Sequence, residues 1–440
     1  MEQLIRNKTA VVISDLHVGD PDIDPEVKKR GLDDFDRDED FVRLLRDVIP
    51  RRVGDSTTLI LNGDFIDFIQ ILPELGRHSA GDRFGATENH SRLKLQQAIK
   101  GHPPIFDSLA TFLANGGQLL VMPGNHDIDF YWPGVFADLR ERLGSVPEPM
   151  LRFVREGAIN EQRVYIEHGN QYSYDNRFEF WSNPILDAPD DRRRLERPWG
   201  TLFLDMVYND IKDLYPFSNK VYPHAQLAWI ALRSFKDDKN VSPKAIARLM
   251  VFFSSKGKRF LWEHFLGETP KDEPVPIDDL WKRLPVLDAN RRTEILAEIE
   301  ALIGAEKGSS KTNQSVSLNS NADRARPTQS VMLGRTDNWG MSKRQADLLR
   351  SGKVDLVAFG HTHKPVDGNK FPPYGTADKR RGFNTGSWVP SIPIGNFEKP
   401  KWRDLGTKPS IADVHYLIID LKPYPTGSLE PLLPPDKTVA

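Results

Sequence analysis

Five short apolar runs in this chain each lead into a small group of aspartate, asparagine or histidine residues. The runs read AVVIS, TLILNG, QLLVMPG, RVYIE and DLVAFG, and long stretches of chain separate them. Apolar runs of this length that end at glycine or turn residues are typical of buried strands. Open α/β sheets place their sites just beyond the carboxyl ends of parallel strands. The pattern therefore predicts an α/β fold in which these polar groups meet at one site.

The side chains that follow the runs offer oxygen and nitrogen atoms and no sulfur. Carboxylate, amide and imidazole ligands suit a pair of divalent ions such as manganese, iron, zinc or nickel. In the Asp-x-His and His-x-His triplets, residues i and i+2 point the same way at a strand end, so both can face the same site. The expected metal ligands are Asp15, His17, Asp64, Asn125, His168, His361 and His363.

These ligands belong to five motifs that occur in a fixed order. The motifs are Asp15-Leu16-His17, Gly63-Asp64-Phe65-Ile66-Asp67, Gly124-Asn125-His126-Asp127, His168-Gly169 and Gly360-His361-Thr362-His363. The set resembles the calcineurin-like metallophosphoesterase superfamily, of bacterial type, over residues 9–175 and roughly 340–420. The resemblance implies a layered α/β (α+β) architecture, with two facing mixed β-sheets flanked by helices.

The resemblance also implies a role for each motif residue. Asp15, His17, Asp64 and His363 would bind one ion, and Asp64, Asn125, His168 and His361 the other, so that Asp64 bridges both. His126 would be the acid–base residue, with Asp127 orienting its imidazole. Asp67 would support the site by a hydrogen bond to a ligand or to the loop backbone.

The implied reaction is hydrolysis of a phosphate mono- or diester by attack of a metal-bridging hydroxide. The cofactor would be two divalent transition-metal ions, manganese first, with iron, zinc or nickel as alternatives. Other interpretations stay open: a nuclease or cyclic-nucleotide phosphodiesterase on the same metals, a nucleotide-lipid pyrophosphatase remotely like the UDP-diacylglucosamine pyrophosphatases, or a non-catalytic scaffold. A nucleic-acid partner is possible through short basic stretches, but the net charge of −2 does not indicate one.

The chain is longer than the motifs require, and the excess lies in one place. Residues 1–178 and 341–440 are expected to form the two parts of the core, and residues 179–340 a helical insertion or lid. A polar segment at about 304–330 is typical of a flexible linker. Because the insertion starts after His168 and ends before His361, its helices either pack on one another or cover the substrate entrance.

Composition limits the remaining choices. The chain has no cysteine, which excludes disulfides and thiolate metal ligands. Its N-terminal segment lacks the apolar stretch of a signal peptide, and no apolar run is long enough to span a bilayer, so we expect a cytoplasmic protein. One segment stays ambiguous between lining the site and packing in the core, namely Asn170, Tyr172, Tyr174, Asn176 and Arg177 directly after His168.

Overall fold

The computed structural model divides the chain into two compact units. The first comprises Met1–Asp205, Asp337–Ser391 and Pro409–Ala440, and the second comprises Met206–Thr336 and Ile392–Lys408. The residues that the structure describes are 3–21, 33–54, 56–71, 86–173, 176–187, 193–198, 200–201, 204, 221–222, 336–370, 380–390, 392–393, 414–422 and 424–432.

A six-stranded mixed sheet forms one layer of the first unit. Its strand order is β14-β13-β1-β2-β3-β4. The strands β1 (Thr9–Ile13), β2 (Thr58–Asn62), β3 (Gln118–Met122) and β4 (Leu151–Phe153) run parallel. The strands β13 (His415–Asp420) and β14 (Thr426–Pro431) extend the sheet in antiparallel pairing beside β1. The carboxyl ends of β1, β2 and β3 therefore lie at the same edge of this sheet.

A four-stranded sheet forms the second layer, in the order β11-β10-β6-β5. The strands β6 (Val164–Glu167), β10 (Leu356–Phe359) and β11 (Arg381–Asn384) run parallel, and β5 (Ala158–Glu161) pairs with β6 in the antiparallel sense. A separate two-stranded pair joins β7 (Ile185–Asp187) to β8 (Arg193–Leu195). In the second unit, β9 (Val221–Tyr222) pairs with β12 (Ile392–Pro393).

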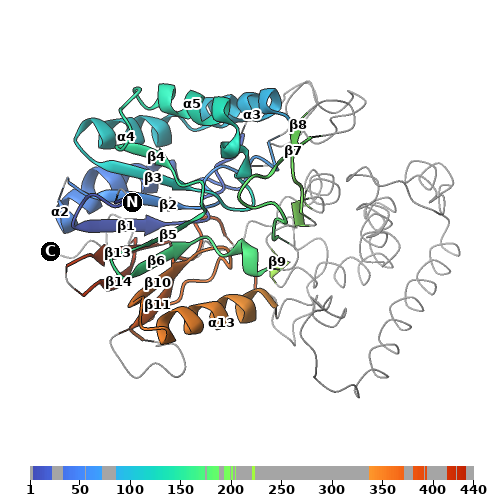
Figure 1. Cartoon of the computed structure of the whole chain (residues 1–440). Helices are drawn as coiled ribbons and strands as arrows, with labels where there is room; N and C mark the ends of the chain where they lie inside the picture. Colours follow the sequence, from blue (N-terminus) through green and yellow to red (C-terminus); the bar gives the residue numbers. More distant parts are fainter. Residues whose placement is uncertain are drawn as a thin grey trace, which may run out of the picture. The chain divides into compact units, whose positions relative to one another are not determined.

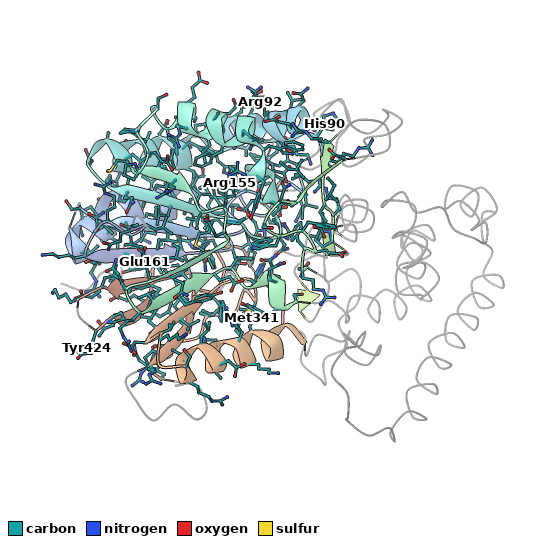
Figure 2. All side chains as sticks on the ribbon, viewed as in Figure 1. His90, Arg92, Arg155, Glu161, Met341 and Tyr424 are labelled. Atoms are coloured by element: carbon teal, nitrogen blue, oxygen red, sulfur yellow. The ribbon has the colours of Figure 1, made fainter. Side chains whose placement is uncertain are left out.

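Alternation along the strands explains how the two sheets face each other. Ala10 and Val12 of β1 belong to the apolar core that also contains Ile166 of β6. Their neighbours Val11 and Ile13 belong to the core on the helical side of the first sheet. Because successive strand residues point to opposite faces, one strand serves both cores. Figure 2 shows the side chains that fill these layers, while Tyr424 projects from the edge and is 77% exposed.

Helices cover the outer faces of both sheets, as Figure 1 shows. The helices α3 (Glu88–Gly101), α4 (Pro103–Ala114) and α5 (Pro133–Arg142) lie on the first sheet's side. The helix α13 (Thr336–Arg350) packs against the second sheet through Met341 and Leu349. The segments α1 (Asp38–Arg43), a π-helical turn (Leu44–Val48) and α2 (Ile49–Val53) follow β1. The expected arrangement of mixed sheets flanked by helices is confirmed.

Several local expectations differ from the structure. The apolar pattern predicts one helix near 91–115, but the chain forms two, since Pro103 and Pro104 lack the amide hydrogen that a continuing helix needs. The sequence also predicts a strand over 382–388, but β11 ends at Asn384 and the following residues form a loop. The pattern also does not predict β5 and β14, whose residues alternate weakly.

Most of the expected insertion lies outside the described residues, including its linker at about 304–330. The proposed boundaries, 179–340, therefore stay a prediction. Within the part of the chain that the structure describes, no helix combines the length and apolar character needed to cross a membrane.

Candidate metal centre

Two loops at the carboxyl edge of the first sheet are tied together by their backbones. The amide of Asp15, after β1, donates to the carbonyl of Gly63, after β2, over 3.1 Å. The amide of His17 donates to the carbonyl of Asp64 over 2.9 Å. The loop after β3 lies equally close, because a Cβ atom on Gly124 would collide with the Asp64 carboxylate. These contacts bring side chains from three strands to one place.

A first group of metal-type ligands consists of Asp15, His17 and His363. One ligand atom from each lies within 4.8 Å of the others. Nε2 of His363 is 3.3 Å from Oδ1 of Asp15 and 3.1 Å from Nε2 of His17. The structure thus brings together three of the four residues expected to hold the first ion.

A second group consists of Asp64, His168 and His361, again within 4.8 Å of one another. Nδ1 of His168 contacts the carbonyl oxygen of Asn62 at 2.8 Å, so it carries a proton and Nε2 is the nitrogen that an ion would bind. That Nε2 lies 3.2 Å from Oδ2 of Asp64. The group contains three of the four residues expected to hold the second ion.

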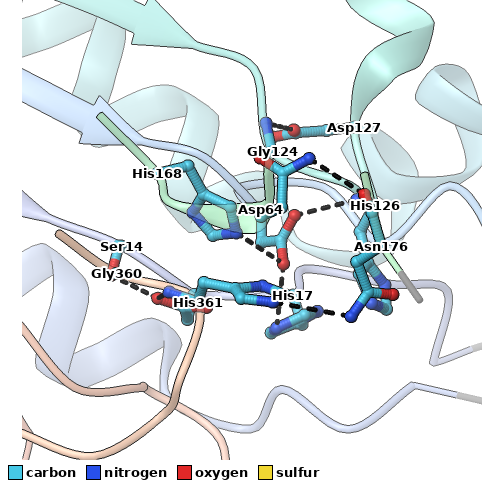
Figure 3. A network of polar contacts seen from close by, with 12 residues as sticks. Ser14, His17, Asp64, Gly124, His126, Asp127, His168, Asn176, Gly360 and His361 are labelled. Carbon is cyan, nitrogen blue, oxygen red and sulfur yellow. Dashed lines mark hydrogen bonds and ion pairs between the residues drawn. The ribbon is translucent and has the colours of Figure 1, made fainter. Parts of the chain in front are cut away.

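Asp64 connects the two groups. Its Oδ2 lies 3.2 Å from Nε2 of His168 and 3.8 Å from Nε2 of His17. Its Oδ1 accepts a hydrogen bond of 2.8 Å from the amide of His126. Figure 3 shows this carboxylate between the imidazoles, which is the position a bridging ligand needs.

Buried atoms without partners test whether a cation fits here. Oδ1 of Asn125 is buried and makes no hydrogen bond within the described residues, and the buried Nε2 of His168 has there only its 3.2 Å contact with Asp64. Leaving such atoms unpaired is costly, so buried groups normally find partners. Both residues are among the ligands expected for the second ion, and a divalent cation would satisfy both atoms. The donor set of carboxylate, amide and imidazole therefore fits divalent ions of borderline hardness.

The backbone at five of the seven expected ligands is left-handed. Its φ is 55° at Asp15, 53° at His17, 52° at Asp64, 67° at His361 and 56° at His363. Non-glycine residues in this region cost about 1–3 kcal/mol each, and such strain clusters at functional sites. The surrounding fold holds these residues in a costly conformation that directs their side chains inward.

Electrostatics at the centre favour bound positive charge. Burial alone would raise the pKa of Asp64, but His168 and His126 outweigh it and hold this pKa well below its usual range. Burial lowers the pKa of His168, yet Asp64 and Asp15 raise it to about 10. Burial and the nearby His168 lower the pKa of His361 to about 3. Carboxylates that stabilise a proton on His168 would stabilise a divalent ion in the same way.

His126 is oriented by a different carboxylate from the one expected. Its Nδ1 lies 2.9 Å from Oδ1 of Asp67. Burial lowers the pKa of His126, but the Asp67 and Asp64 carboxylates outweigh the effect of burial and raise this pKa to about 9. Asp127 instead accepts hydrogen bonds from the amides of Gly124 at 2.6 Å and Phe65 at 2.7 Å. The expectation that Asp127 orients His126 is therefore corrected. Asp127 joins the loops after β2 and β3, while Asp67 takes the orienting position.

Polar residues at the end of β11 and in the loop that follows it also support the centre, and the five motifs do not predict them. We call this group, Asn384, Thr385 and Ser387, the bracket. Nδ2 of Asn384 donates to the carbonyl of Gly360 at 2.6 Å and to Oγ1 of Thr362 at 3.2 Å. Oγ of Ser387 donates to the carbonyl of Asp15 at 3.0 Å. Together these bonds hold the His-x-His loop and the Asp15 loop.

The hydroxyl of Ser14 contacts the bracket. It contacts the Asp15 carboxylate and lies 2.6 Å from Oγ1 of Thr385. The run Asn384-Thr385-Gly386-Ser387 is a usable sequence signal, since it places polar, turn-forming residues at the end of a parallel strand.

The segment after His168 divides between packing and the site. Asn170 is buried and donates from Nδ2 to the carbonyl of Asn176 at 3.1 Å. The hydroxyl of Tyr172 donates to Oε2 of Glu167 at 2.7 Å, away from the ligand groups. Arg177 is exposed, and Tyr174 lies outside the described residues. Asn176 of this segment approaches a ligand, with Nδ2 at 3.5 Å from Nε2 of His361.

Comparison with known proteins gives a family match for the part of the chain that carries five of the seven expected ligands. Residues 8–203 match the family model of the calcineurin-like phosphoesterases. A search of curated proteins finds no match. Two solved structures give weak matches. The first is TT1561 of Thermus thermophilus, 11% identical with a TM-score of 0.26, covering 97% of this chain and 100% of that one.

The second is the calcineurin-like phosphoesterase YfkN from Bacillus subtilis, 12% identical with a TM-score of 0.29, covering 96% of this chain and 90% of that one. These identities and TM-scores are too low to support a conclusion about the site. The assignment of the domain to a family therefore rests on the family match. The chain therefore contains a calcineurin-like phosphoesterase domain over residues 8–203 and is a hydrolase that acts on phosphoric ester bonds.

Proposed function

We propose that this protein is a binuclear metal-dependent phosphoesterase that hydrolyses a phosphate mono- or diester. One observation carries the proposal: the Asp64 carboxylate lies between two histidine-containing ligand groups, 3.2 Å from His168 and 3.8 Å from His17. A single carboxylate has two oxygens and can serve two ions. Manganese is the first candidate, with iron, zinc or nickel as alternatives, because the ligands are oxygen and nitrogen atoms.

The ligand assignment extends this observation to the seven residues. Asp15, His17 and His363 would share one ion with Asp64, and Asn125, His168 and His361 the other. Two such ions supply Lewis-acid activation of water and neutralise charge on the phosphate. The protein's own contribution is to fix the ligands by strained backbone and by the bracket around Asp15.

Proton transfer is assigned to His126. Despite burial, the Asp67 and Asp64 carboxylates raise its pKa and so favour the protonated imidazole, the form that donates to a phosphate oxygen or to the leaving oxygen. Asp67 fixes the ring by its contact with Nδ1, which leaves Nε2 as the nitrogen for proton transfer. The second interaction of Asp67, 3.3 Å from Nδ1 of His17, links this acid to the first ligand group.

Metal analysis and a substrate panel test the proposal. Protein incubated with manganese should contain close to two equivalents, and Asp64→Ala should lose both ions or most of the activity. The panel combines aryl phosphomonoesters and diesters, nucleotides, single-stranded DNA and RNA, and a UDP-linked lipid. Protein that stays free of metal and inert on every phosphoester would contradict the proposal and favour a scaffold.

A further inference from the structure

Asn176 lies at the metal centre although it belongs to none of the five motifs. Its side chain is half-buried, and Nδ2 is 3.5 Å from Nε2 of His361 (Figure 3). The buried Asn170 holds the Asn176 carbonyl, and the amide of Arg177 bonds the Ser173 carbonyl at 3.1 Å. The backbone at Asn176 is thus anchored, which places its side-chain amide beside the second ligand group.

The contacts of this amide nitrogen are weak. One is to Oγ of Ser173 at 3.3 Å and the other is to His361 at 3.5 Å. Both exceed the usual range of about 2.7–3.2 Å for such bonds. If Nε2 of His361 binds an ion, its lone pair is occupied and cannot accept from Asn176. The N–H of Asn176 that faces His361 is then left without an acceptor at that contact.

We propose that Asn176 is a substrate-binding residue, whose amide nitrogen donates a hydrogen bond to a non-bridging oxygen of the substrate phosphate. The inference rests on the proposed function, because it assumes that a phosphate is bound beside His361. The chemistry fits the position. A neutral amide donor stabilises the phosphate, whereas a carboxylate in the same place would repel it.

A purely structural role makes a different prediction. If Asn176 only steadied the His361 ring, its loss would weaken metal binding. The contact of 3.5 Å is too long to fix the ring strongly, and the amide of His361 is already held by Asp15 Oδ1 and Oδ2 at 3.1 and 3.0 Å. The ligand loop therefore has firmer support than Asn176 provides.

The test compares metal content with phosphate binding in manganese-loaded protein. The variants are Asn176→Ala, the isosteric Asn176→Asp, and Asn160→Ala as a control at an exposed asparagine of β5. Inorganic phosphate is the probe, and its Kd is measured by calorimetry. We expect two metal equivalents in all proteins and an unchanged Kd in the control. The Kd should rise about tenfold or more in Asn176→Ala, the scale of one hydrogen bond to a charged group, and further in Asn176→Asp.

Three outcomes overturn the inference. They are a wild-type Kd in Asn176→Ala, a wild-type Kd in Asn176→Asp, or a loss of metal that accounts for weaker phosphate binding in both variants. The proposed function fails separately, when the wild-type protein itself takes up no metal and binds no phosphate. If the wild-type protein binds two ions and phosphate and both variants match it, only the role of Asn176 is refuted.

Discussion

The carboxylate of Asp67 lies 2.9 Å from Nδ1 of His126, and both side chains are buried. This contact fixes the imidazole of the proposed acid beside the two ligand groups. The rings of His126 and His17 also meet edge to face, with centroids 4.5 Å apart. The loops after β1, β2 and β3 therefore bring His17, Asp67 and His126 into contact with one another.

His126→Ala should separate catalysis from metal binding. The His126 side chain belongs to neither of the groups assigned to the two ions, so the variant should keep close to two metal equivalents. Its rate should fall by roughly 10²–10⁴, the usual scale for a lost acid–base group. Metal analysis beside the rate on an aryl phosphate checks both points. Loss of metal in this variant would mean that His126 is itself a ligand.

The variants Asp67→Asn and Asp127→Asn should affect different properties, the first mainly the rate and the second mainly the stability. Asp67 contacts His126 and His17, so its replacement should lower the rate of the folded protein, in addition to any stability lost with the bonds that Asp67 accepts from Gln70. Asp127 accepts bonds from two backbone amides, so its replacement should mainly destabilise, by about 1–3 kcal/mol for each acceptor lost. Thermal unfolding and the rate of the remaining folded protein distinguish the two. A wild-type rate in the folded Asp67→Asn protein, or unchanged stability in Asp127→Asn, would contradict this division.

Asn384→Ala should weaken metal binding although Asn384 is not a ligand. The substitution removes donors to the carbonyl of Gly360 and the hydroxyl of Thr362, which hold the His-x-His loop. Groups that orient metal ligands typically contribute about 10–100-fold in affinity. Asn369→Ala is a matched control, since this exposed asparagine also donates to a backbone carbonyl, that of Gly427 at 2.9 Å. Competition with a metal chelator measures the affinity, and equal values for the two variants would refute the bracket's role.

Stability should fall as the pH rises from about 6.5 to about 9, because of His102. Its Nε2 lies 3.0 Å from Asp33, and its Nδ1 lies 2.9 Å from Asp38. Burial lowers the pKa of His102, but the two carboxylates outweigh it and raise the pKa to about 9. A raised pKa in the folded state stabilises the fold below the unfolded pKa, near 6.5, and this stabilisation disappears as the pH rises through about 9.

The raised pKa of His102 contributes on the order of 3 kcal/mol to the free energy of unfolding. The pKa rises from 6.5 to about 9, and a difference of one in pKa corresponds to about 1.4 kcal/mol. Urea unfolding at about pH 6 and about pH 9.5, on either side of this window, measures this contribution. In His102→Gln the difference between the two pH values should shrink, whereas an unchanged difference would assign the pH dependence to other groups. His90→Gln, on the helix that ends just before His102, is the control.

The sequence by itself determined where the metal-type ligands lie. Each follows an apolar run whose strand character is local, and parallel pairing then aligns the carboxyl ends. The predicted strands at 9–14, 57–62 and 118–121 match β1, β2 and β3 to within one residue at each end. Asp15, Asp64 and His168 consequently meet although they are distant in the chain, and the ordered motifs supply the expectation of two ions.

Only the tertiary structure decided which polar groups support those ligands. Asp127 adjoins His126 in sequence, yet Asp67, 59 residues away, contacts its ring. The hydroxyls of Ser14 and Thr385 meet across 371 residues. Asn176 approaches His361 because Asn170 holds its carbonyl. Such contacts depend on loop conformation and on the packing of the two sheets, which side-chain periodicity does not encode. The sequence therefore indicated the candidate ligands and a supporting role for Asp67, but not which side chain each supporting group contacts.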